Sequence, residues 1–332
     1  MSYRQTDDFS GFLSICYHYI RPEKKVDNFP RILGHEISIF EDHLSILKQN
    51  YDLISLDESL GYLKGNKTFK KKFGALLTFD DGLSDHYEAA KILNENEIKG
   101  VFFIPSCIVE DNKPANPIII HYGLAMFGIE RFLAEYKIIL ESNNILDKQY
   151  VIKFEKGVDN VWEVINRIKQ MFIYNFDIFT ARKILLQIFD QLILSEYPDA
   201  MKIMHLTKEK IKKMLEMGHS IGTHSHTHVS VGGSNLSKHD FNKEVISPKK
   251  ILEKEFGTKI LAMSYPFGEE QDCLSTAKLI ENTHDFQLAF TIKSILNTQT
   301  TPLLELGRYQ PTSSDDAKKL ANTLKEIVKI NS

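Results

Sequence analysis

The sequence predicts an α/β domain built around a parallel β-sheet, either open or closed into a barrel. Short runs that are apolar on both faces alternate with amphipathic helical stretches, which is typical of strands covered by helices on both sides. Roughly eight strands in such an alternation are enough for either architecture. The runs with strand character are Phe12–Ile20, Tyr51–Leu56, Ala75–Phe79, Gly100–Pro105, His219–His224, Lys259–Pro266, Phe286–Ile292 and Leu303–Gln310.

The helices between these strands carry end signals. Ser38 and Glu41 have the spacing of a capping box ahead of apolar residues at helical intervals. Thr207 is expected to cap a later helix that ends at Gly218.

The middle of the chain has a different pattern, which is helical with little strand character. We therefore expect an α/β domain formed by residues 1–110 and 205–332, interrupted by a helical insertion at 111–204. The insertion either adds packing or a surface for a homo-oligomer, or forms a lid or a wall for substrate. Its helical segments are Gly128–Ser142, Val161–Tyr174 and Asp177–Leu194.

The composition is that of a globular protein with enough apolar side chain for a core, since 42% of the 332 residues are hydrophobic and 26% are charged. The formal net charge of −3 argues against nucleic acid as a partner. Cys16, Cys107 and Cys273 are far apart and odd in number, so they indicate neither a disulfide framework nor a cysteine-zinc site.

The beginning of the sequence has no features of a secretory signal. Asp7 and Asp8 stand where a signal peptide needs positive charge and then an apolar run. The first apolar run is short and contains His18, and no stretch approaches the roughly 20 apolar residues that cross a bilayer. We expect a cytoplasmic protein without a membrane span.

Two adjacent carboxylates, Asp80 and Asp81, follow the strand candidate Ala75–Phe79. Buried carboxylates are costly unless a cation neutralises them. Neighbouring side chains of a strand point to opposite faces, but Gly82 allows a bend that turns both toward one centre. The alternative is a polar turn in which one Asp caps the next helix.

Four of the twelve histidines fall within ten residues, at positions 219, 224, 226 and 228. Neutral imidazoles are good ligands for zinc and similar ions. His224 and His228 share a face if the loop takes one helical turn, whereas an extended chain would align His224, His226 and His228. A cluster of solvated histidines is the alternative, but a metal site is favoured.

Two weaker signals complete the set. Pro266 and Gly268 frame a turn that can present backbone N–H groups to a developing oxyanion, although such a turn is more often only structural. His18 closes the first strand candidate, and a lone histidine is usually structural unless that strand end meets the other sites.

Taken in order, the run Thr78–Gly82 (TFDDG), the His-Ser-X-X-His spacing of His224–His228 and the Tyr-Pro-Phe-Gly turn of Tyr265–Gly268 resemble the polysaccharide deacetylase family. This is the NodB homology domain, a metal-dependent carbohydrate esterase. The resemblance covers roughly residues 10–110 and 205–310. It implies a distorted (β/α) barrel carrying a long helical insertion.

The resemblance also implies a ligand set and a base. Asp81, His224 and His228 would bind one divalent metal ion, and Asp80 would act as the general base. Zinc is the first expectation for the ion, with cobalt, nickel or iron as alternatives.

Further roles follow from the third motif and the histidine loop. The Phe267 N–H would share the oxyanion with the metal, and Ser225 would support the histidine loop. Tyr265, Pro266 and Ser225 are the residues we expect next to the substrate.

The sequence departs from the family at two positions. The chain has no good copy of the late Leu-X-His motif that supplies the general-acid histidine in chitin-type members. We therefore expect His18 to be the acid, as in members that open with Tyr-His, with the late His284 as the alternative. Many members have an Arg at the position of Ser264 that orients the base; Arg308 is our candidate for its replacement.

The implied reaction is removal of an N-acetyl group from an amino sugar by an activated water molecule. With no export signal recognised, an intracellular sugar linked to a nucleotide or a lipid, or an oligosaccharide, is the expected substrate. Two alternatives are an allantoinase-like hydrolase of a small amide and an inactive carbohydrate-binding descendant. A non-haem iron oxygenase shares the ligand types, but there the carboxylate lies close to the first histidine in the sequence.

Overall fold

The fold is built on one parallel seven-stranded sheet, seen in a computed structural model that describes residues 10–330 apart from the side chains of Leu274 and Ser275. The strand order is β1-β5-β6-β7-β8-β9, with β4 beside the first part of β5. A separate two-stranded ladder joins β2 and β3. The strands are β1 (Gly11–Tyr17), β2 (Ile20–Arg21), β3 (His35–Glu36), β4 (Asp52–Leu53), β5 (Phe73–Phe79), β6 (Val101–Ile104), β7 (Ser220–Thr223), β8 (Ala262–Ser264) and β9 (Leu288–Phe290).

The segment after β9 closes the curled sheet into a distorted barrel. Leu306 forms a parallel bridge with Phe290 of β9, and Tyr309 forms one with Ile15 of β1. The strand expected over Leu303–Gln310 is therefore only a pair of bridges. The physical reason is Gly307, whose N–H and carbonyl are both bound by the side chain of Asn297 and so are withdrawn from the ladder.

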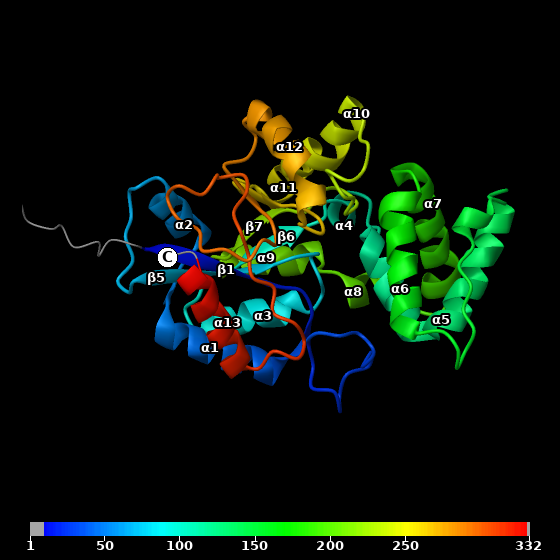
Figure 1. The fold of residues 1–332 in the computed structure, drawn as a ribbon, viewed down its shortest axis with the longest axis horizontal. Helices are drawn as coiled ribbons and strands as arrows, with labels where there is room; N and C mark the ends of the chain where they lie inside the picture. The colour runs from blue at the N-terminus through cyan, green and yellow to red at the C-terminus, as the bar shows by residue number, and fades with distance from the viewer. Residues whose placement is uncertain (1–9, 331–332) are drawn as a thin grey trace, which may run out of the picture.

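Helices cover the outside of the barrel (Figure 1). Thr207 accepts the N–H of Lys210 at the start of its helix, and Gly218 follows the helix end with φ of 84°, as predicted. The helices of this part are α1 (Ile37–Asn50), α2 (Leu56–Leu63), α3 (His86–Glu95), α4 (Cys107–Glu110), α9 (Lys208–Glu216), α10 (Lys238–Phe241), the π-helix η4 (Asn242–Ile246), α11 (Ser247–Phe256), α12 (Glu270–Thr283) and α13 (Ala317–Ile330).

The capping box predicted at Ser38 is wrong. Helix α1 begins at Ile37, and Glu36 is its N-cap without a side-chain hydrogen bond. Glu36 is already extended because it pairs with Arg21 in the small ladder, so the helix starts directly from that strand. A complete capping box lies at the start of α2 instead, where Ser55 and Glu58 each bond the other's backbone N–H.

The insertion is a separate group of helices at one end of the molecule, drawn in green in Figure 1. Its buried residues nevertheless belong to the same hydrophobic cluster as the residues packed between the sheet and its outer helices, such as Ile15 and Phe40, so the two parts are packed together. Its elements are α5 (Asn116–Ser142), the 3₁₀-helix η1 (Lys148–Tyr150), α6 (Val161–Gln170), the π-helix η2 (Met171–Asn175), α7 (Ile178–Ile188), the π-helix η3 (Phe189–Leu194) and α8 (Ala200–Met204).

Helix α5 is long and apolar enough by composition to cross a membrane. Its continuity is broken at Gly128, where φ is 78° and ψ is 167°. Before the break, Ile118 and Ile119 are buried in the common core; after it, Phe132 and Ile139 are also buried there. The core of the insertion therefore buries about a third of the most apolar stretch of this helix, 33% of its residues.

Two buried histidines act as neutral structural links. His205 Nε2 accepts the Ala115 N–H at 3.2 Å, while its Nδ1 lies 3.2 Å from the Gly82 carbonyl. His219 Nδ1 accepts the Gly100 N–H at 3.1 Å, while its Nε2 lies 2.9 Å from the Ala90 carbonyl. Each ring must keep one bare nitrogen to accept its backbone donor, so protonation breaks a buried bond.

We expect the free energy of unfolding to decrease as the pH falls below about 6.5, the ordinary pKa of histidine. Burial lowers the pKa of His205 to about 4 and lowers that of His219 as well. At a pH between the pKa values of the folded and the unfolded chain, the unfolded chain binds more protons. Each ring then lowers the free energy of unfolding by at most about 1.4 kcal/mol per pH unit. Urea unfolding at pH 7, 6 and 5 measures this slope.

His219→Gln is the matched variant, since an amide can accept from Gly100 and donate to Ala90 without titrating. It should reduce the dependence of stability on pH. An unchanged slope in this variant would contradict the assignment of His219 as a neutral link.

Candidate metal centre and catalytic site

The polar residues singled out in the sequence come together at the carboxyl ends of the parallel strands, where α/β barrels build their sites. Asp80 and Asp81 follow β5 directly, and His224 follows β7. His18 follows β1, and Phe267 lies three residues beyond the end of β8. Parallel pairing places all of these strand ends at one edge of the sheet.

The backbone is strained where the site is built. Asp81, Ser225, His228 and Phe267 all have positive φ, between 56° and 78°, a region that non-glycine residues rarely adopt. Such residues cost of order 1–3 kcal/mol each and cluster at functional sites. The bend expected at Gly82, whose φ is 58°, therefore begins one residue earlier and turns the Asp81 carboxylate toward the histidines.

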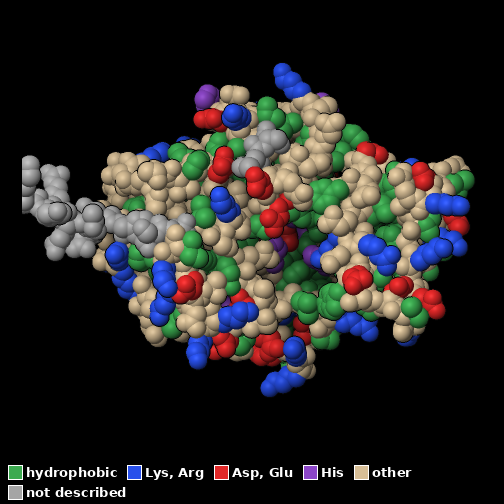
Figure 2. Space-filling view, viewed as in Figure 1, with side chains coloured by type: hydrophobic (Ala, Val, Ile, Leu, Met, Phe, Trp, Pro, Cys, Tyr) green, Lys and Arg blue, Asp and Glu red, His purple; other side chains and the backbone are tan. Residues whose placement is uncertain are grey.

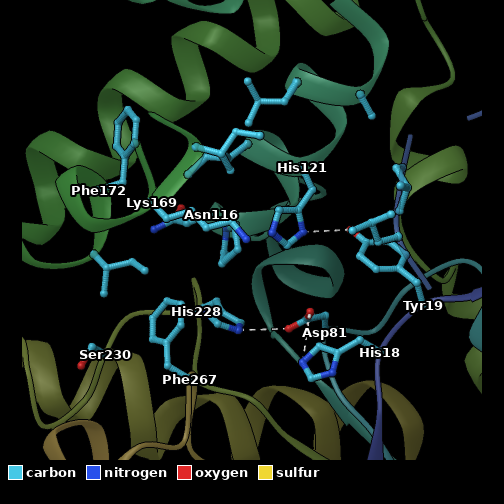
Figure 3. A pocket seen from close by; sticks show the side chains of 18 of the residues that line it. His18, Tyr19, Asp81, Asn116, His121, Lys169, Phe172, His228, Ser230 and Phe267 are labelled. Carbon is cyan, nitrogen blue, oxygen red and sulfur yellow. Dashed lines mark hydrogen bonds and ion pairs between the residues drawn. The ribbon is translucent and has the colours of Figure 1, made fainter. Parts of the chain in front are cut away.

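Asp81, His224 and His228 form a buried cluster whose candidate ligand atoms all lie within 4.8 Å of one another. Asp81 Oδ1 is 3.3 Å from His224 Nε2 and 3.0 Å from His228 Nε2. Figure 3 shows Asp81 and His228 facing each other below the cavity, with Phe267 beside His228.

The chemistry of this cluster fits a divalent cation. Asp81 Oδ1 and His224 Nε2 are buried and have no hydrogen-bond partner among the described residues. His224 Nδ1 is 3.0 Å from the Ser264 carbonyl, so it carries the proton and leaves Nε2 bare toward Asp81. A fixed tautomer of this kind is typical of metal-binding histidines, and one carboxylate with two imidazoles leaves further coordination positions open.

The charges of the cluster shift one another's pKa values. Burial favours the neutral form of Asp81, but His228 and His224 outweigh it and hold the pKa of this carboxyl well below its ordinary value. Burial would lower the pKa of His224 too, yet Asp80 and Asp81 raise it above its usual value. Burial and His224 together lower the pKa of His228.

The structure resolves the two alignments left open for the histidine cluster. His224 and His228 converge because the chain turns after His224, with Ser225 Oγ accepting the His228 N–H at 2.9 Å. His226 belongs to a different set of contacts, with Ser106 Oγ at 2.8 Å and Asp111 Oδ2 at 3.1 Å. His226 is therefore not part of the cluster formed by Asp81, His224 and His228.

Arg308 occupies the interior of the barrel next to Asp80. Its Nη1 and Nη2 donate to the two oxygens of Asp80, each at 2.8 Å, and its Nε donates to the Thr291 carbonyl. Both side chains are almost completely buried. Burial alone would raise the pKa of Asp80, but the Arg308 guanidinium more than compensates and holds it below its ordinary value.

Ser264 connects this ion pair to the candidate metal ligands. Its hydroxyl lies 3.2 Å from Asp80 Oδ1 and 2.6 Å from His224 Nδ1. The guanidinium that binds Asp80 therefore comes from Arg308. Ser264 occupies the position at which many family members have an Arg.

His18 and His284 differ in their surroundings. The side chain of His18 is 30% exposed, lines the cavity above the site and has Nε2 4.0 Å from Asp81 Oδ2. His284 is an exposed residue at the end of α12 and is not among the described residues that line this cavity.

The third motif contributes its backbone. The Phe267 N–H has no intramolecular acceptor within residues 10–330, and the Phe267 ring lines the cavity. The side chains expected next to the substrate require a correction. Tyr265 is fully buried with its hydroxyl donating to the Leu304 carbonyl, so it cannot contact a ligand in the cavity. Pro266 is buried as well, and Ser225 bonds the histidine loop.

A cavity of about 870 Å³ lies above the site, between the barrel and the insertion. It opens as the hollow with an apolar floor near the centre of Figure 2, where histidine and acidic side chains are visible. Asp81, His18 and His228 line it. The insertion contributes polar residues that no sequence motif revealed, namely Asn116, His121 and Lys169.

Tyr19 and His121 meet in the wall of this cavity, joined by the dashed line in Figure 3, with Tyr19 Oη 3.2 Å from His121 Nδ1. Burial, together with the nearby charge of Lys169, lowers the pKa of His121 to about 3, so this ring is neutral. The one available signal in the sequence was a polar residue directly after the apolar run Ile118–Ile120.

A curled parallel sheet with an aspartate and two histidines at its carboxyl edge defines a class of candidate metal-dependent hydrolases. The model of one such family, polysaccharide deacetylase, matches residues 67–284, which is more than half of the chain. The protein belongs to the polysaccharide deacetylase family. No curated protein matches the sequence.

Solved structures show a similar fold. The chain resembles the deacetylase PplD from Streptococcus pyogenes, solved in complex with acetate, at a TM-score of 0.56 and 15% identity, covering 95% of this chain and 97% of that one. It resembles IcaB from Ammonifex degensii at a TM-score of 0.55 and 16% identity, covering 96% of this chain and 98% of that one. It also resembles a de-N-acetylase from Aggregatibacter actinomycetemcomitans at a TM-score of 0.54 and 14% identity, covering 95% of this chain and 99% of that one.

We expect the purified protein to bind one divalent cation per chain through Asp81, His224 and His228. Substitution of a residue that only orients a metal ligand weakens metal affinity by about 10–100-fold. His228→Ala and Asp81→Ala each remove a ligand itself, so each should weaken cation affinity by more than about 100-fold. Equilibrium dialysis with Zn²⁺ and the visible spectrum of the Co²⁺ form measure this. His226→Ala is the matched control and should bind normally; equal losses in all three variants would contradict the assignment.

Arg308→Met should lower the free energy of unfolding by about 3–5 kcal/mol, because it leaves Asp80 as an unpaired buried charge. Adding Asp80→Asn removes that charge, so the double variant should recover part of the loss. Urea unfolding of the two variants measures the difference. A double variant less stable than the single one would show that the ion pair is not the source of the effect.

Proposed function

We propose that this protein is a metal-dependent deacetylase that removes N-acetyl groups from an amino-sugar-containing substrate. The observation that carries the proposal is the arrangement at the end of the cavity. Asp81, His224 and His228 bring candidate ligand atoms within 4.8 Å of one another, and Asp81 Oδ1 and His224 Nε2 are buried without a hydrogen-bond partner among the described residues. A second carboxylate, Asp80, adjoins them, with His224 Nε2 4.0 Å from its Oδ2. The family membership supports the same reaction class.

Asp81, His224 and His228 would hold the cation, with zinc as the first candidate and cobalt, nickel or iron as alternatives. When bound, such a cation polarises an amide carbonyl and lowers the pKa of a water molecule from 15.7 toward about 7.

The residues of the chain supply the remaining steps. Asp80 accepts the proton of the attacking water at a carboxylate oxygen, since it is ionised and fixed by Arg308. The Phe267 N–H donates to the carbonyl oxygen as negative charge develops on it. His18 reaches the cavity wall next to Asp81 and protonates the departing amine, which cannot leave as an anion. The products are acetate and a free amino sugar.

Arg308 is a positioning residue in this scheme. Its two parallel bonds restrict the Asp80 carboxylate to one orientation, which a single-point ammonium cannot do. The orientation of Asp80 in turn decides which of its oxygens faces the cluster of ligands.

The size of the cavity favours an amino-sugar substrate over a small amide of the allantoinase type. Sites for ligands of drug size measure about 300–1,000 Å³, and this cavity is near the upper end of that range at about 870 Å³. A small amide would leave most of it filled with water. The intact cluster and the ionised base also argue against an inactive carbohydrate-binding descendant.

The test is release of acetate from a panel of N-acetylated substrates: sugar nucleotides, lipid-linked sugars and chito-oligosaccharides. The zinc- or cobalt-loaded protein should release acetate from at least one of them. Asp80→Asn should reduce kcat by about 10²–10⁴, the usual contribution of a general base, while cation binding persists. Loaded protein inactive toward every sugar but active toward allantoin would contradict the proposal.

His18→Ala should lower kcat more with an ordinary acetamide than with a substrate whose leaving amine is activated, such as an N-acetylated aromatic amine. The reason is that a good leaving group needs less help from a general acid. His284→Ala is the matched control and should leave both rates unchanged. A loss confined to His284→Ala would reverse the assignment of the acid.

A further inference from the structure

The cavity continues far beyond the residues that carry the chemistry. It extends between the helices of the insertion, where its wall is mainly apolar apart from Asn116, His121 and Lys169. Ile120, Leu124 and Ile129 of α5 form one side of it. Ile165 of α6 and Ile178 of α7 are also in the wall.

Such a wall is unsuited to a polysaccharide chain. Each sugar ring carries several hydroxyl groups, and a hydroxyl buried without a hydrogen-bond partner costs roughly 1–3 kcal/mol. Aliphatic side chains offer no partner. A hydrocarbon chain has no such groups and gains about 0.8 kcal/mol for each methylene that it buries.

A cation lies within this apolar space. Lys169 of α6 is half-buried and lines the cavity, and it forms no ion pair or hydrogen bond among the described residues. Figure 3 shows it between Phe172 and Asn116, on the insertion side of the cavity. Burial lowers its pKa, although the charge of Asp81 acts in the opposite direction. An ammonium in this position is costly unless an anion compensates it.

A second cation and an apolar rim mark the opening. Arg31 lines the cavity beside Gly128, where α5 is broken, and it too has no ion-pair partner in the described part of the chain. Trp162, the single tryptophan of the sequence, lines the cavity and is 59% exposed. Leu33 at the same opening is 58% exposed.

We propose that the substrate is an amphiphile in which the N-acetylated amino sugar is joined through an anionic group, such as a phosphate, to a hydrocarbon chain. The sugar amide lies at Asp81, His224 and His228, the anion pairs with Lys169, and the chain lies along the aliphatic wall of the insertion. This assignment rests on the proposed deacetylase function for its reaction, but the binding of the chain and the anion does not depend on catalysis.

Binding is tested first, without turnover, through the fluorescence of Trp162. The metal-free protein and Asp80→Asn are titrated with hexyl, octyl and decyl phosphate, with decanol and with inorganic phosphate. Affinity should rise with chain length, by at most about fourfold per buried methylene. Decyl phosphate should bind at least tenfold more tightly than either decanol or inorganic phosphate. Geranyl phosphate, also with ten carbons, compares an isoprenoid chain with a straight one.

Two variants separate the chain from the anion. Lys169→Met should weaken the binding of decyl phosphate at least tenfold and leave the binding of decanol unchanged. Lys169→Arg should restore most of the lost affinity for decyl phosphate. Ala125 of α5 lines the cavity, so Ala125→Phe narrows it and should weaken the binding of both decyl phosphate and decanol. Equal affinity for all chain lengths, or no effect of Lys169→Met on decyl phosphate, would overturn the proposal.

Turnover is tested next with substrates that share one N-acetylated sugar. The loaded protein should show at least a 100-fold higher kcat/KM for an N-acetylglucosaminyl decyl phosphate than for N-acetylglucosamine 1-phosphate or chito-oligosaccharides. If oligosaccharides are better substrates and alkyl phosphates do not bind, this inference fails and the deacetylase proposal stands. If alkyl phosphates bind but no substrate releases acetate, the deacetylase proposal fails and the amphiphile stands as the ligand of the cavity.

Discussion

The ion pair of Asp80 and Arg308 is the constraint on which the rest of the structure depends. Both charges are buried in the barrel, and neither is tolerable there alone. Arg308 belongs to the segment that bridges β9 and β1, whereas Asp80 ends β5 on the other side of β1. The segment that closes the barrel therefore also brings the guanidinium to the carboxylate. The same contact stabilises the closed sheet and orients the candidate base.

Backbone strain is concentrated at the same edge. Asp81, Ser225, His228 and Phe267 are held with positive φ although each has a side chain. The buried strands before them and the hydrogen bonds around them maintain these conformations. The Ser225 hydroxyl holds the His228 N–H, and His205 holds the carbonyl of the Gly82 turn. The stability of the barrel core thus supports a site geometry that the loops would not adopt by themselves.

Much of the barrel and its site could be predicted from the sequence, because apolar runs followed by Asp80, His224 or His18 place polar groups at strand ends, and parallel strands share an edge. Features that depend on tertiary packing could not. The side chain of Asn297 interrupts the last expected strand at Gly307, and nothing local indicates this. Tyr265 was misplaced because its motif gives no information on which way a turn residue points. His121 and Lys169 lie on helices with no motif, and only the folded insertion brings them to the cavity.

The two ends of the insertion explain why a cavity formed by added helices can act together with the barrel. At its entry, the N–H groups of Cys107 and Asn116 donate to the carbonyls of His226 and Thr227, within the histidine loop. At its exit, Leu206 donates to the Gly82 carbonyl, next to Asp81. The insertion is therefore attached to both loops that carry the candidate ligands. A shift of its helices would move Asp81 relative to His228, so the position of the cavity wall and the geometry of the metal site are mechanically coupled.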